Sequence, residues 1–119
     1  MSAFTINDSK EYIQSQTAVF QAALGAINGL EGKVTTQDAA SGQIEAKFDK
    51  KILGKVLGDR THFAATISSS GEKTAVSVTI YPLNAVGQPL MFGARKGVSR
   101  TVANWFFAHL EHRLGQNGG

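Results

Sequence analysis

The chain of 119 residues contains no cysteine, only two prolines and a single tryptophan. The lack of cysteine excludes a disulfide framework, a thiolate zinc site and a cysteine nucleophile. No apolar run approaches the ~20 residues that a membrane-spanning helix needs. The start, Met1-Ser2-Ala3-Phe4, lacks the basic and apolar segments of a secretory signal. We therefore expect a cytoplasmic protein, and no motif indicates a cofactor or a metal.

Charged residues are also scarce, at 18%, while hydrophobic residues make up 42%, which is typical of a folded domain. No repeat or linker divides the sequence, so residues 1–119 are predicted to form a single domain. The net charge of +3 is unevenly distributed. Segments 50–60 and 95–100 each carry +3, which leaves −3 for the remainder. This pattern favours an anionic partner at two places rather than general binding of polyanions.

The stretch from Val98 to Leu114 predicts the helix around which the rest of the chain is organised. Its wide apolar face has helical spacing and consists of Val98, Val102, Trp105, Phe106, His109, Leu110, Arg113 and Leu114. An earlier helix is predicted from about Ser9 to Asn28, because Asp8 and Glu11 resemble a capping box. Its apolar stripe would contain Ile13, Phe20, Leu24 and Ile27, and Gly29 would end it.

Strand patterns occupy the middle of the chain. A short strand at 3–6 precedes the first helix, and further strands are predicted at 33–37, 43–49, 61–68 and 74–81, with Pro82 ending the last. The three longer strands alternate between apolar and polar residues, which indicates an antiparallel sheet with one wet face. The sequence therefore predicts an α+β fold in the order β-α-β-β-β-β-α, with both helices packed on one face of the sheet.

This order of elements resembles that of TATA-binding-protein-like and helix-grip domains. The resemblance covers most of the chain and rests on element order, without a shared motif. Helix-grip relatives imply an apolar or amphipathic ligand between the sheet and the C-terminal helix. Some members of the other group bind nucleic acid, but this chain gathers few cations for that purpose. The leading interpretation is a non-enzymatic binding or interaction module.

One candidate ligand site is the basic turn before the last helix. Arg95, Lys96 and Arg100 lie there without an intervening acid, and a helix N-terminus favours anions. Phe92 and Trp105 would line an apolar cleft between the final helix, the loop from Leu83 to Phe92 and the sheet. A small enzyme that holds an anionic substrate at this turn is an alternative, and a solvated cluster of charges is another.

A second candidate is an interaction surface in which lysines flank aliphatic side chains. It comprises Lys50, Lys51, Ile52, Leu53, Lys55, Val56 and Leu57. Its partner would be another protein, a second copy of the chain, or weakly an anionic membrane. Alternatively, a short strand or turn packs the aliphatic groups and points the lysines to water. Neither the pair His109 and His112 nor the run 68–71 has the surroundings that a metal or catalytic site requires.

Overall fold

The computed structural model describes residues 5–84, 86–89 and 97–116. Its elements are β1 (Ile6–Tyr12), α1 (Gln16–Gly29), β2 (Lys33–Asp38), β3 (Gln43–Phe48), β4 (Lys51–Ile52), β5 (Lys55–Val56), β6 (Arg60–Ser70), β7 (Lys73–Leu83) and α2 (Val98–Gln116). The predicted α+β class is confirmed, and β4 and β5 add a small hairpin to the predicted order. Within this description, neither helix is long and apolar enough to cross a lipid bilayer.

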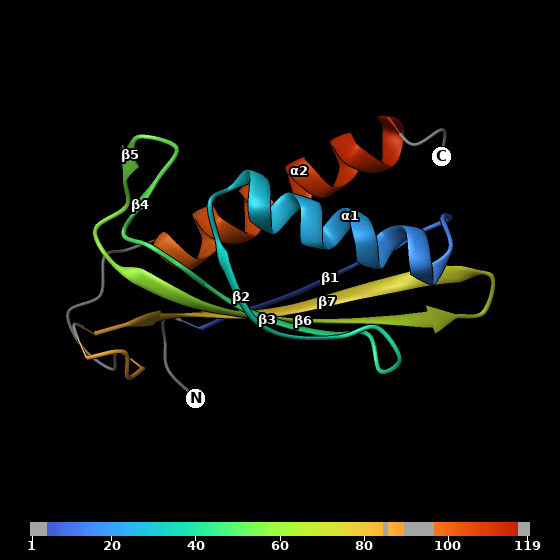
Figure 1. The fold of residues 1–119 in the computed structure, drawn as a ribbon, viewed down its shortest axis with the longest axis horizontal. Coiled ribbons are helices and arrows are strands. Elements are labelled where there is room, and N and C mark those ends of the chain that lie inside the picture. The colour runs from blue at the N-terminus through green and yellow to red at the C-terminus, as the bar shows by residue number, and fades with distance from the viewer. Residues whose placement is uncertain (1–4, 85, 90–96, 117–119) are drawn as a thin grey trace.

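Five strands form one antiparallel sheet in the order β1-β7-β6-β3-β2. The first strand pairs with the last, with Ile6 opposite Ile80 and Tyr12 opposite Thr74. Both helices lie on the same face of this sheet, as predicted (Figure 1). Because β1 returns to the edge beside β7, its side chains on the helix side lie under α2.

The helix-covered face of the sheet is apolar because alternate strand residues point toward it. Its buried members are the predicted ones: Ile44, Ala46, Phe48, Phe63, Ala65, Ile67, Val76, Val78 and Ile80. The ring centroid of Phe63 lies 4.7 Å from that of Phe106 on α2 and 5.7 Å from that of Phe48. The aromatic cluster therefore joins the sheet to α2 directly.

The first helix begins seven residues later than predicted, at Gln16 instead of Ser9. The Ser15 hydroxyl caps it by accepting a hydrogen bond from the Ala18 N–H at 3.2 Å. The capping box at Asp8 and Glu11 is a wrong prediction, because these residues belong to β1 and pair with β7. A cap contributes only about 1 kcal/mol, which a full row of strand pairing outweighs. Ile13 consequently lies outside the helical stripe and is 75% exposed.

Two strands also extend beyond their predicted ends. β6 reaches Ser70, and β7 continues through Pro82 to Leu83. Pro82 pairs with Thr61 of β6, whereas the pairing with β1 already ends at Ile80. Proline is tolerated here because, among the described residues, no strand faces Pro82 on the side of β7 that carries β1.

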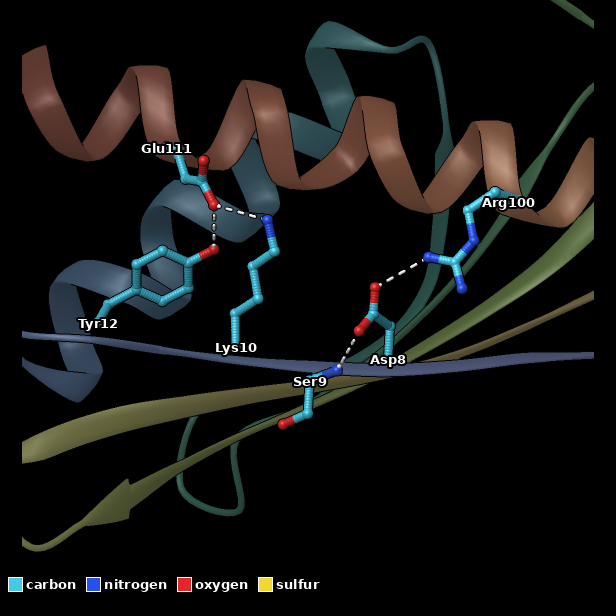
Figure 2. Close-up of polar contacts among 6 residues, drawn as sticks. All are labelled: Asp8, Ser9, Lys10, Tyr12, Arg100 and Glu111. Atoms are coloured by element: carbon cyan, nitrogen blue, oxygen red, sulfur yellow. Dashed lines mark hydrogen bonds and ion pairs between the residues drawn. The ribbon is translucent and has the colours of Figure 1, made fainter.

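Polar side chains from β1 hold α2 over the sheet, as Figure 2 shows. Arg100 Nη1 donates to Asp8 Oδ2 at 3.0 Å. Further along the helix, Glu111 Oε2 accepts from Lys10 Nζ at 3.2 Å and from the Tyr12 hydroxyl at 2.8 Å. Exposed ion pairs contribute only about 0–1 kcal/mol each, so these contacts orient α2 more than they stabilise the fold.

The Tyr12 contact predicts a loss of stability in alkali. Burial, together with the neighbouring Glu111 carboxylate, raises the pKa of Tyr12 well above its usual 10.0. The folded protein therefore keeps the phenol protonated where the unfolded chain ionises, and stability falls as the pH rises above about 10. Tyr12→Phe should flatten this decline. Urea unfolding between about pH 8 and about pH 11 measures it, and identical declines in parent and variant would contradict the assignment.

Candidate ligand-binding site

The β4–β5 hairpin rises from the sheet on the helix side (Figure 1) and has a strained turn at its tip. Ile52 pairs with Lys55, so Leu53 and Gly54 form a two-residue loop. Their φ angles are +51° and +82°, the combination found in type I′ turns. Leucine is crowded at positive φ, at a cost of about 1–2 kcal/mol. Its neighbours must therefore stabilise this conformation.

Glu31 provides one such contact. This residue follows the last turn of α1 and also has a positive φ, +65°. Its Oε1 accepts a hydrogen bond from the Leu53 N–H at 2.8 Å. The contact ties the tip of the hairpin to the end of α1 and fixes where the Leu53 side chain points.

A pocket of about 230 Å³ lies where the hairpin faces α2. We call it the apolar pocket, and its lining residues are Leu30, Ile52, Leu53, Lys55, Trp105 and His109. Leu30 and Ile52 form a rigid floor, since each is 1% exposed. Leu53 is 52% exposed and is available to a ligand at the rim. Apolar walls with a few polar groups are typical of small-molecule sites, although this one is smaller than most.

The apolar pocket brings together residues that the sequence analysis placed in two separate sites. Trp105 of the predicted ligand cleft lies with Ile52, Leu53 and Lys55 of the predicted interaction surface. The remaining members of that surface do not line the pocket. Lys50, Lys51 and Val56 are exposed, and Leu57 packs partly against the core. The role of the hairpin as a docking surface for another macromolecule stays a prediction.

A second pocket, of about 460 Å³, adjoins the first through His109. We call it the basic pocket, and it is lined by Gly29, Ala108, His109, His112 and Arg113. Arg113 lies close to α1: a Cβ added at Gly25 would be 2.9 Å from its Nη1, and one added at Gly29 would be 3.1 Å from its Nη2. The sequence analysis did not identify Arg113 as a site residue. The spacing of Gly25 and Gly29, one helical turn apart, was the available signal for a close approach.

Side chains occupy the described part of the interface between α2 and the sheet. Phe63, Phe106, Ile80 and Leu110 are all fully buried there. The helix-grip resemblance implied a ligand at this interface. Because Trp105, His109 and Arg113 line hollows on a different face of α2, toward α1 and the hairpin, we place the candidate site there.

The predicted anion site before α2 is described only in part. Phe92, Arg95 and Lys96 lie outside the described residues. Arg100 is paired with Asp8 and does not line the apolar pocket. Anion binding at this turn therefore stays a prediction. Residues 5–84, 86–89 and 97–116 contain no group of three His, Cys, Asp or Glu that could bind a metal.

Comparison with known proteins supports the fold. No protein-family model matches the sequence, and no curated protein matches it either. The crystal structure of Ara h 8.0201 is 10% identical and aligns over 93% of this chain and 97% of its own, with a TM-score of 0.55. TTHA0849 from Thermus thermophilus is 9% identical over 97% of this chain and 99% of its own, with a TM-score of 0.47. Both neighbours are helix-grip-type folds. Of the two arrangements that the element order resembles, the alignment with Ara h 8.0201 supports the helix-grip one.

Proposed function

We propose that this protein is a binding module and that its ligand is a small molecule whose apolar part enters the apolar pocket. The observation that carries the proposal is Leu53, a half-exposed leucine held at positive φ on the rim of a pocket that contains Trp105. Residues in strained conformations persist where their surroundings fix them, and they cluster at ligand sites. Glycine or asparagine would adopt this backbone conformation with less strain than leucine.

Two further properties of the pocket support ligand binding. Its floor is pre-formed by the buried side chains of Leu30 and Ile52, so little ordering is required when a ligand enters. Trp105 supplies a large and rigid apolar surface, which favours contact with an alkyl chain or an aromatic ring. Each Å² of apolar surface removed from water contributes roughly 25 cal/mol.

The enzymatic alternative depends on the turn that contains Arg95, Lys96 and Arg100. Only Arg100 of these is described, and its guanidinium contacts a carboxylate of the protein itself. The binding proposal instead rests on described side chains that converge on one hollow. We therefore favour a binding module over an enzyme.

The first test uses 1-octanol as a neutral apolar probe. Trp105 is the sole tryptophan of the chain, so its fluorescence reports directly on the apolar pocket. We expect a saturable change of this fluorescence with octanol in the parent protein. Leu53→Asn should weaken octanol binding about tenfold, because asparagine tolerates the left-handed backbone but provides no apolar side chain.

The matched control is Val56→Asn. Val56 belongs to the same hairpin and is 75% exposed, but it does not line the apolar pocket. This variant should bind octanol like the parent. A parent protein without a saturable response, or equal losses in the two variants, would contradict the proposed site.

A further inference from the structure

The two pockets that meet at His109 differ sharply in chemistry. Four of the six residues that line the apolar pocket have apolar side chains: Leu30, Ile52, Leu53 and Trp105. The basic pocket instead presents the imidazoles of His109 and His112 and the guanidinium of Arg113. A molecule that extended from one pocket into the other would therefore meet apolar side chains at one end and hydrogen-bond donors at the other.

The Arg113 guanidinium lies against the last turn of α1, on one side of the basic pocket. Glycine at positions 25 and 29 lets it approach the backbone of α1, where a Cβ would lie 2.9 Å from Nη1 or 3.1 Å from Nη2. The negative end of the α1 dipole favours a cation at this position. A pre-positioned guanidinium loses less conformational entropy when it binds a ligand, and its planar fork matches a carboxylate or a phosphate.

No acidic residue is among the described residues that line the two pockets. Among the residues that the structure describes, none forms an ion pair with Arg113. Two acids follow or precede lining residues in the sequence, and both are engaged elsewhere. Glu111, beside His112, accepts from Lys10 and Tyr12 on the β1 side of α2, and Glu31, after Leu30, accepts from the Leu53 N–H. Lys55 adds a further cation at the rim of the apolar pocket. The charge around the shared His109 is thus complementary to an anion.

From this arrangement we infer that the ligand is an amphipathic anion. Its apolar part occupies the apolar pocket, and its carboxylate or phosphate head binds Arg113, His112 and His109 in the basic pocket. The inference deepens the proposed function and rests on it, because it assigns a head-group site next to the proposed apolar one. It adds Arg113 and His112 as the residues that select the ligand by charge.

The experiment compares probes that share one alkyl chain and differ in head group: octanoate, octyl phosphate, 1-octanol and octylamine. Binding is followed at low ionic strength by Trp105 fluorescence and by calorimetry. We expect octanoate or octyl phosphate to bind at least tenfold more tightly than octanol, and octylamine to bind more weakly than octanol. The tighter of the two anions identifies the preferred head group.

Two variants locate the head group. His112→Glu places an acid in the basic pocket at an exposed position, so it should fold normally and weaken anion binding about tenfold while leaving octanol binding unchanged. Asn104→Glu is the matched control, since it introduces the same acidic side chain on an exposed part of α2 that lines neither pocket. Arg113→Gln should likewise remove the preference for anions, and its octanol affinity shows whether the apolar pocket remains intact.

The outcomes separate the two proposals. If octanol and the anions bind equally and His112→Glu has no effect, the head-group site is wrong while the apolar pocket stands. Equal weakening of anion binding by His112→Glu and Asn104→Glu would also overturn it, because general charge would then explain the effect. If no probe gives a saturable response, the proposed function itself fails.

Discussion

Replacing Phe106 by alanine is expected to lower the free energy of unfolding by about 3–5 kcal/mol. The side chain is 0% exposed, and its ring lies between Phe63 of the sheet, at 4.7 Å, and Phe107 of the same helix, at 5.3 Å. Alanine would leave a cavity at the point where α2 contacts the sheet. A domain of this size has about 5–15 kcal/mol of stability in total, so the variant would approach unfolding.

Urea denaturation of the parent and the Phe106→Ala variant measures this loss. The slope of the unfolding free energy against urea should stay constant while the midpoint falls. Ile13→Ala is the control, because it also truncates an apolar side chain, but one that is 75% exposed. It should change stability by less than about 0.5 kcal/mol. A loss below about 1 kcal/mol for Phe106→Ala would rule out the packing described for α2.

The core could be predicted from the sequence because periodicity reports directly on burial. Alternation along 43–49, 61–68 and 74–81 identified the inward side chains of three strands, and all nine are buried. The helical spacing of Val102, Phe106 and Leu110 identified the buried face of α2 in the same way. Such patterns are reliable where a whole face is buried, since each misplaced residue would expose apolar surface.

A strand before the first helix was predicted, but at 3–6 instead of Ile6–Tyr12, because the inward side chains of β1 are mostly polar and give no apolar alternation. Asp8 and Lys10 point toward α2 and find their partners there, in Arg100 and Glu111. Those partners lie about one hundred residues away in the sequence, so no local pattern identifies them. The capping signal at Asp8 was the strongest local feature, and long-range strand pairing overrode it.

The candidate site was predictable only in pieces. The sequence drew attention to Leu53 and Trp105 separately, as part of a hairpin and of a helix. The positive φ of Leu53 could not be predicted, because the sequence has leucine where asparagine or glycine usually indicates such a turn. Arg113 was not identified as a site residue because it falls within the apolar stripe of α2. In the structure it lies close to α1, in the space left by Gly25.

Among the glycines of the described structure, Gly42 is the one at which substitution by alanine is expected to lower stability most. Gly42 is buried, has a φ of +73°, and precedes β3 directly. A Cβ at this position would lie 1.9 Å from the backbone oxygen of Ile67, far inside van der Waals contact. That oxygen also accepts a hydrogen bond from Gln16 Nε2 at 2.9 Å, and the Ile67 N–H donates to the Gly42 oxygen at 2.8 Å. The clash therefore falls on backbone that two contacts hold in place.

Alanine at position 42 must push β3 away from β6 or break the contacts around Ile67. We expect a loss of about 3 kcal/mol or more, measured by urea denaturation, because left-handed strain and a backbone clash act together. Gly71→Ala separates the two causes. Gly71 has a similar φ of +65°, but a Cβ there would meet nothing within 4 Å. Its loss should be limited to the strain of about 1–2 kcal/mol. Equal losses at the two positions would mean that Gly42 is required for its backbone angle alone and that β3 can move away from Ile67 without cost.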